Sequence, residues 1–163
     1  MKDYHKTMPV HVSESQEHIL DFLKQNAVAV LATVDDHKHP HAAAIYYVVD
    51  DDLCFFFITK RETAKNQNLQ KNHQAALVIY EASSQTTVQA NGSVNEETDA
   101  TKAQDIFKKV LKLSLATSET GVPPISKLQA GAYIAYKFKP ESVRMASFVR
   151  PDGGTAEKIF ETA

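Results

Sequence analysis

Residues 27–59 read AVAVLATVDDHKHPHAAAIYYVVDDDLCFFFIT. Three apolar runs in this stretch, 27–34, 42–49 and 53–59, are rich in β-branched and aromatic residues, a composition typical of strands. The polar segments DDHKHP and DDD separate the runs. Connections this short join only antiparallel neighbours. The stretch therefore predicts a three-stranded antiparallel meander.

Further strands are predicted after this stretch. Alternating or β-branched patterns indicate strands at 73–80, 87–91 and 132–139. The turn PDGG at 151–154 predicts a closing hairpin that joins 143–149 to 155–160. About six strands connected mostly as hairpins favour a closed or nearly closed antiparallel barrel over a sheet of parallel strands.

Two amphipathic helices are predicted beside these strands. Ser13 and Gln16 form a capping-box pattern ahead of an apolar stripe. Thr98 or Asp99 caps a longer helix, in which apolar residues recur at helical spacing over 103–111 and lysines follow toward the C-terminal end. The chain is thus mainly β with flanking helices.

The remaining segments connect these elements. The polar segment 60–72 predicts a short surface helix or a turn, and 117–130, which holds one glycine and two prolines, predicts a loop. No repeat, low-complexity tract or linker divides the chain. Residues 1–163 are therefore expected to form a single domain.

The middle apolar run, 42–49, is apolar at odd and even positions alike. Because successive side chains of a strand point to opposite faces, both faces of this strand must be covered. One face would pack in the barrel interior, and the other against a helix, a ligand or a second copy of the chain. The pattern alone thus predicts a dimer or a buried ligand.

Composition excludes several classes of function. The 18 basic and 20 acidic side chains leave a formal net charge of -2, so neither nucleic acid nor an anionic membrane is an expected partner. No apolar run is long enough to span a bilayer, and the N-terminus lacks the apolar centre of a secretory signal, so a cytoplasmic location is expected. Cys54, the single cysteine, lies in an apolar run and is expected to be a buried core residue.

No pattern marks a catalytic residue or a metal site. The five glycines form neither a dinucleotide fingerprint nor a P-loop, and no nucleophile, base and acid set is evident. His37 and His39 fall in a polar turn, and no second cluster completes a ligand set, so no metal is expected. The segment TKRETAK, 59–65, is a candidate anion site because a strand there opens into a helix start with three cations. An ordinary solvated connection is the alternative.

Several segments, taken in order, resemble the pyridoxamine 5′-phosphate oxidase-like split barrels that bind flavin mononucleotide (FMN). They are LATVD at 31–35, Pro40-His41 with the strand that follows, FFFITK at 55–60, T-x-K at 63–65, Asn68-Leu69 and VQANG at 88–92. The resemblance covers roughly residues 15–145 and implies a six-stranded antiparallel split barrel, a homodimer and an FMN cofactor shared between its two copies.

The resemblance also implies the flavin-binding residues. The second strand would lay its backbone along the isoalloxazine ring, the end of the third strand would lie beside the ribityl phosphate, and Lys65 would bind the phosphate. Thr87 or Gln89 would reach the flavin from the second copy, and the sequence does not choose between them. The implied set is Ala43, Ala44, Ile45, Tyr46, Ile58, Thr59, Lys60, Thr63, Lys65, Thr87 and Gln89.

Departures from the family bear on activity. The true oxidases have arginine where this chain has Ala43 and Ala64, so Lys60 or Arg61 would have to replace a cationic contact. Their C-terminal signature of tryptophan and paired arginines is also missing, because the chain has no tryptophan. We therefore expect an FMN-dependent oxidoreductase that acts on a small molecule, not a pyridoxal phosphate-forming oxidase. The alternatives are a flavin sensor or carrier without turnover and a haem-handling barrel; the donor, the acceptor and the exact flavin stay open.

Overall fold

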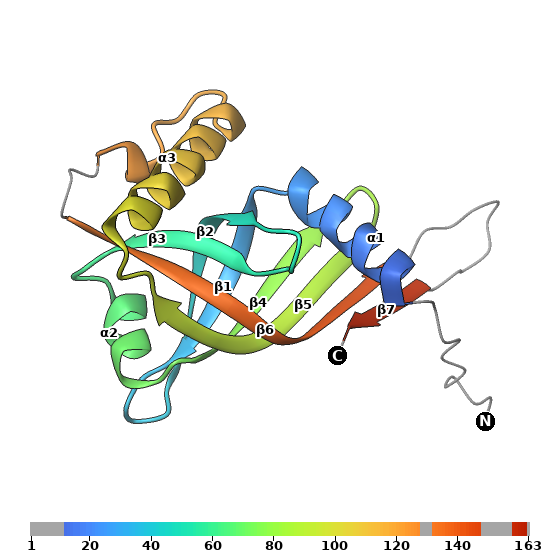
Figure 1. Ribbon diagram of the computed structural model, residues 1–163, viewed down its shortest axis with the longest axis horizontal. Coiled ribbons are helices and arrows are strands. Elements are labelled where there is room, and N and C mark those ends of the chain that lie inside the picture. The colour runs from blue at the N-terminus through green and yellow to red at the C-terminus, as the bar shows by residue number, and fades with distance from the viewer. Residues whose placement is uncertain (1–11, 128–131, 148–157, 163) are drawn as a thin grey trace.

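The computed structural model describes residues 12–127, 132–147 and 158–162 (Figure 1). These residues form, in chain order, α1 (Val12–Gln25), β1 (Val28–Val34), β2 (Pro40–Val49), β3 (Phe55–Lys60), α2 (Ala64–Lys71), β4 (Gln74–Glu81), β5 (Thr86–Glu96), α3 (Ala100–Thr117), the 3-10 turn η1 (Pro124–Lys127), β6 (Tyr133–Ser147) and β7 (Lys158–Thr162).

The strands form a closed barrel. Their order in the sheet is β3-β2-β1-β4-β5-β6-β7, and β3 also pairs with β6, so the first six strands close on themselves while β7 extends the sheet from β6. Every pairing is antiparallel. The predicted six-stranded antiparallel barrel with flanking helices is confirmed.

The last part of the barrel differs from the prediction. The sequence indicates separate strands at 132–139 and from 143, but β6 is one strand that passes through Pro140. Its register with β5 shifts at Asn91 and Gly92, next to that proline. Only glycine fits at position 92, because a Cβ there would collide with the carbonyl oxygen of Lys139. The bulge therefore accommodates a proline that a regular ladder would not.

The structure also corrects or defines the boundaries of several helices and turns. The predicted capping box is wrong, because α1 begins at Val12 with Ser13 already helical, and the Gln16 side chain donates to the carbonyl oxygen of Asp51 instead, at 2.8 Å. Asp99, not Thr98, caps α3 by accepting from two backbone N–H groups. The segment 60–72 contains a helix, and the predicted loop 117–130 contains η1. The strand pairing of the predicted hairpin is present in β6 and β7, whereas its turn, 151–154, lies outside the described residues.

The barrel interior holds the main core. Side chains that are less than 2 % exposed fill it, among them Leu31, Tyr47, Phe55, Phe57 and Phe138. The helices α1 and α2 lie at opposite ends of the barrel (Figure 1), and Leu23 and Leu69 respectively complete the core from these helices. Cys54 is buried as predicted.

A second, smaller core lies outside the barrel, where α3 packs on β2 and β3. Ile106 and Val110 of α3 join Ile58 and Ile125 there, and Tyr46 of β2 packs against them. The outer face of β2 is therefore divided along its length. Its C-terminal half is covered by α3, whereas Ala42 and Ala44 stay exposed.

The outer faces of β1 and β4 continue this exposed region. Val28 and Val30 on β1 and Tyr80 on β4 are large apolar side chains that remain exposed. Val30 lies directly opposite Ala44 on one side and Val78 on the other. We call this surface, formed by Ala42, Ala44, Val28, Val30, Val78 and Tyr80, the outer apolar face.

None of the described helices is long and apolar enough to cross a membrane.

Candidate functional site

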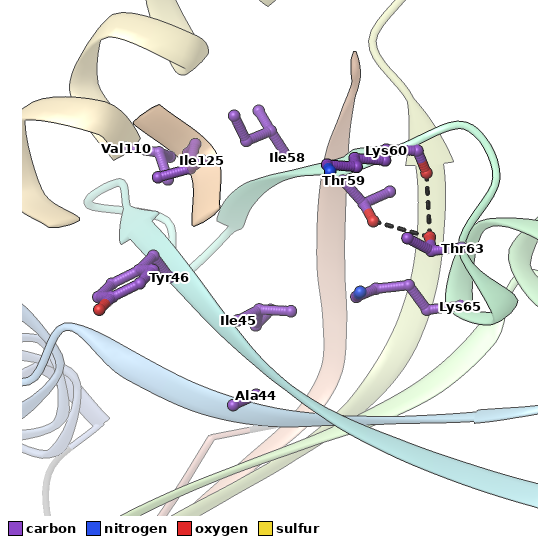
Figure 2. A pocket seen from close by; sticks show the side chains of 10 residues that line it. All are labelled: Ala44, Ile45, Tyr46, Ile58, Thr59, Lys60, Thr63, Lys65, Val110 and Ile125. Carbon is purple, nitrogen blue, oxygen red and sulfur yellow. Dashed lines mark hydrogen bonds between the residues drawn. The ribbon is translucent and has the colours of Figure 1, made fainter. Parts of the chain in front are cut away.

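A cavity of about 250 Å³ lies at the edge of the outer apolar face, between the strands β2 and β3 and the helices α2 and α3. Figure 2 shows the side chains that line it. They are Ala44, Ile45, Tyr46, Ile58, Thr59, Lys60, Thr63, Lys65, Val110 and Ile125.

The two ends of this cavity differ in chemistry. Ile58, Val110, Ile125 and the ring of Tyr46 gather on one side, and the hydroxyls of Thr59 and Thr63 and the ammonium of Lys65 gather on the other, with the end of the Lys60 side chain near Ile58 (Figure 2). Such a cavity suits a ligand that has a flat apolar part and an anionic group at its far end.

Local hydrogen bonds build the polar end. Thr63 caps α2, since its Oγ1 accepts from the backbone N–H of Asn66, and it also donates to the carbonyl oxygen of Lys60 at 3.0 Å. The hydroxyls of Thr59 and Thr63 are 2.9 Å apart and share a hydrogen bond. These contacts fix the turn that leads from β3 into α2. Within this segment Thr59 is buried and Lys65 is half-buried, whereas Lys60, Arg61, Glu62 and Ala64 are exposed.

Lys65 is the distinctive charge of the site. Its side chain leaves the first turn of α2 and extends into the cavity toward Ile45 (Figure 2). Burial lowers the pKa of its ammonium below the usual value of 10.5. No residue in the described ranges forms an ion pair with it, whereas Lys71 of the same helix is exposed and pairs with Asp36 at 2.6 Å. A bound anion would supply the missing counter-charge.

The structure brings most of the predicted site residues together. Eight of the residues named from the resemblance line the cavity: Ala44, Ile45, Tyr46, Ile58, Thr59, Lys60, Thr63 and Lys65. Ala43 is adjacent on β2, where it pairs with Leu31 of β1, but it does not line the cavity.

Thr87 and Gln89 lie elsewhere in the same chain. Both are on β5, which β1 and β4 separate from β2. Their side chains share the outer face of β5, as the alternation of the sequence predicts, with Gln89 exposed and opposite Val78 of the outer apolar face. Within one chain they therefore do not contribute to the cavity.

Sequence reasoning missed the apolar wall formed by Val110 and Ile125. Val110 belongs to the apolar stripe of α3, a pattern that predicts a core residue, and it does pack in the second core as well as lining the cavity. Ile125 follows two prolines in a segment without periodicity, so no local signal marks it. Both residues reach the cavity only because α3 and η1 fold back over β2 and β3.

The other candidates behave as ordinary structural residues. His37 and His39 lie in the exposed β1–β2 turn, where the His39 ring is 3.1 Å from a carboxylate oxygen of Asp35. No group of three or more His, Cys, Asp or Glu residues in the described ranges could hold a metal ion. Burial raises the pKa of the Cys54 thiol, so it is not an activated nucleophile.

The closed antiparallel barrel with its flanking helices defines the class of protein as a split barrel. Residues 15–147 match the family model for pyridoxamine 5′-phosphate oxidase, and the chain belongs to that family. No curated protein matches the chain in sequence.

Solved structures of low sequence identity share the fold. A Listeria innocua protein described as a pyridoxamine 5′-phosphate oxidase is 22% identical, with a TM-score of 0.64 over 80% of this chain and 96% of the other. The haem storage protein HutZ of Vibrio cholerae is 16% identical, with a TM-score of 0.58 over 77% and 89%. A haem-binding protein of Mycobacterium smegmatis is 14% identical, with a TM-score of 0.65 over 93% of this chain and 59% of the other.

Proposed function

We propose that the cavity binds FMN and that the protein is an FMN-dependent oxidoreductase. The single observation that carries this proposal is the half-buried ammonium of Lys65, which has no acidic partner among the described residues and lies at the polar end of an otherwise apolar cavity. FMN has a flat ring system at one end and a phosphate at the other. The two ends of the cavity match these two parts.

The residues present fit the cofactor. Lys65 would pair with the phosphate, and the Thr59 and Thr63 hydroxyls, which hydrogen-bond to each other and, from Thr63, to the Lys60 carbonyl oxygen, would shape the polar end beside it. Lys60, which is exposed at the end of β3, could supply the cationic contact that arginine provides in the true oxidases. Ala44, Ile45 and Tyr46 would border the ring, and Val110 and Ile125 would shield it from water.

The flavin would supply the redox chemistry, accepting electrons from a reduced donor and passing them to a small acceptor. The chain's own residues would bind the flavin and orient it. The ionisable side chains that line the cavity are Tyr46, Lys60 and Lys65. Two of these, Lys60 and Lys65, are assigned to the phosphate end. A proton would therefore be transferred by Tyr46 or by solvent.

A haem-handling role is the second candidate, because two proteins of this fold are described as haem-storing or haem-binding. Haem iron in proteins is held by His, Cys, Met or Tyr. The described residues that line the cavity include Tyr46 but no His, Cys or Met. A haem in this cavity would therefore have to be held by Tyr46 or by a residue from outside the described lining.

We further propose a cytoplasmic homodimer that associates through the outer apolar face. A cavity of about 250 Å³ is smaller than the roughly 300–1,000 Å³ typical of ligand sites, and a second copy would enlarge and close it. Val30, Val78 and Tyr80 would become buried in such an interface. From the same face of the second copy, Thr87 or Gln89 would reach the flavin.

The proposed activity excludes pyridoxal phosphate synthesis. The chain has no tryptophan, and its arginines are Arg61, Arg144 and Arg150, so the anchor of the true oxidases for the vitamin phosphate is missing. Assays with pyridoxamine and pyridoxine phosphates should give only background turnover. Aldehyde formation at ordinary enzyme rates would contradict this exclusion.

The proposal is tested by titrating the protein with FMN and with riboflavin, which lacks the phosphate. Lys65→Ala removes a charge-assisted hydrogen bond of about 1.5–3 kcal/mol, so FMN affinity should fall about ten- to a hundredfold. Riboflavin affinity should hardly change. Lys60→Ala should behave similarly if Lys60 replaces the missing arginine.

Lys71→Ala is the matched control, because it removes a lysine from the same helix at a position outside the cavity. It should leave both affinities unchanged. Equal losses of FMN and riboflavin in Lys65→Ala, or no loss of either, would remove Lys65 from the site. Anaerobic bleaching of the bound flavin by a nicotinamide donor would separate an oxidoreductase from a sensor or carrier.

A further inference from the structure

The helix α2, which carries Lys65, is attached to the barrel by a tyrosine of the barrel core. Tyr136 of β6 is 1% exposed, and its ring stacks on Phe57 of β3 with centroids 5.5 Å apart. Its hydroxyl donates to Oδ1 of Asn66 at 2.6 Å. The hydrogen bond therefore joins the centre of the barrel to the first turn of α2.

Asn66 transmits this contact to the β3–α2 turn. It is 6% exposed, and its Nδ2 donates to the carbonyl oxygen of Arg61 at 2.6 Å. Its backbone N–H donates to Oγ1 of Thr63, the hydroxyl that also contacts Thr59 and the backbone of Lys60. Both sides of the Asn66 amide are thus bonded, one to the barrel and the other to the turn.

A second contact fixes the direction of the helix. Gln70, one turn after Asn66, donates to the Tyr136 hydroxyl at 3.0 Å. Burial is the main cause that raises the pKa of this hydroxyl, so it keeps its proton and remains a donor to Asn66 at neutral pH. Because Tyr136 contacts α2 at two points one turn apart, it restrains both the position and the orientation of that helix.

Lys65 lies between the two residues that this network holds, Thr63 and Asn66. We propose that Tyr136 is a positioning residue for the anionic end of the ligand: acting through Asn66, it aims the Lys65 ammonium into the cavity. This inference rests on the proposed function, since it assigns to Tyr136 a share in the preference for FMN over riboflavin. Tyr136 itself does not line the cavity.

The chain offers a matched control in Tyr47. This residue is also 1% exposed, and its hydroxyl donates to a backbone oxygen, that of Leu23 in α1, at 2.9 Å. Tyr47→Phe and Tyr136→Phe therefore each remove one buried hydroxyl from the barrel core, with one hydrogen bond lost in Tyr47→Phe and two, to Asn66 and from Gln70, lost in Tyr136→Phe. Only Tyr136→Phe acts on α2.

The test compares FMN and riboflavin affinities in the full-length wild type and in both variants. Tyr136→Phe should weaken FMN binding about three- to tenfold, the equivalent of one hydrogen bond, and change riboflavin affinity less than about twofold. Tyr47→Phe should leave the ratio of the two affinities at its wild-type value. If the role of Tyr136 were purely structural, Tyr136→Phe would weaken the binding of both ligands to the same extent.

A double-mutant cycle tests whether the effect passes through Lys65. In a Lys65→Ala background, Tyr136→Phe should no longer alter FMN affinity, because the group that it positions is absent. Asn66→Ala, which leaves the barrel core intact, should reproduce the selective loss of FMN binding even if Tyr136→Phe fails to fold.

The outcomes separate this inference from the proposed function. Equal FMN and riboflavin affinities in the wild type would refute both. A wild type that prefers FMN, combined with an unchanged ratio in Tyr136→Phe and Asn66→Ala, would overturn the role of Tyr136 alone. A full effect of Tyr136→Phe in the Lys65→Ala background would likewise show that Tyr136 does not act through Lys65.

Discussion

On strand β1, Ala29 and Leu31 point into the barrel and are 1% and 0% exposed, whereas Val28 and Val30 point outward and are 41% and 39% exposed. Both pairs of side chains are apolar, yet the first pair is completely packed and the second pair stays exposed. The difference teaches that apolarity by itself does not identify the inside of this barrel. Whether a face is buried depends on which elements of the protein pack against it.

The same contrast extends to β2, where the outer face is covered at one end and open at the other. Tyr46 packs against α3, and Ala44 lines the cavity next to the exposed Val30. The candidate site therefore lies at the border between the helix-covered and the open parts of the outer surface. A ligand there would be bordered by α3 on one side and, in the proposed dimer, by a second copy on the other.

The largest expected effect concerns the inner face. Leu31→Ala should lower the free energy of unfolding by about 2–5 kcal/mol, since it leaves a cavity in the barrel interior, whereas Val30→Ala on the outer face should cost less than about 1 kcal/mol within one chain. Denaturant titration measures the free energy of unfolding of both variants. Repeating it at several protein concentrations separates the contribution of association from that of folding. Equal losses would mean that the two faces are packed alike.

The next effect concerns the outer face. Val30→Asp should dissociate the proposed dimer at micromolar concentration, because it would bury an unpaired carboxylate in the interface, while the fold of each chain should persist. Light scattering would report the mass, and Thr101→Asp on the exposed start of α3 serves as the control. A variant that stays dimeric would place the interface elsewhere, and a monomeric wild type in excess FMN would refute the dimer.

The smallest expected effect is a pH dependence of FMN affinity that Lys65, unlike the exposed lysines, should cause. Because burial lowers the pKa of free Lys65, the charged form is disfavoured in the folded protein; this cost to stability is full below the lowered pKa and is lost between it and the usual value of 10.5. Bound phosphate reverses the preference, because it stabilises the ammonium. FMN affinity should therefore fall with rising pH, up to about tenfold, where the phosphate, with a second pKa of about 6, stays ionised.

Titrations from about pH 7 upward would measure this effect, with riboflavin and Lys65→Ala as controls that should show no such dependence. A pH dependence of equal size for riboflavin would assign it to another group. A flat profile for FMN would mean that the charge of Lys65 makes no contribution to binding.

The sequence by itself determined the antiparallel meander of β1, β2 and β3, because short polar turns between apolar runs leave no other pairing. It also predicted a candidate anion site in the segment 59–65, which includes Thr59, Thr63 and Lys65, because these residues are close together in the chain and the chemistry of a strand end that opens into a helix is local. The alternation in β5, with Val88 inside and Gln89 outside, likewise follows from local periodicity.

Only the tertiary structure decided which long-range contacts complete the barrel and the site. The continuation of β6 through Pro140 depends on the bulge at Gly92, which is far away in sequence. Val110 and Ile125 reach the cavity because α3 folds back over β3, and Tyr136 meets Asn66 because β6 closes the barrel against β3. Periodicity reports which face of an element is apolar, whereas the partner of that face is determined by chain closure, which no local pattern encodes.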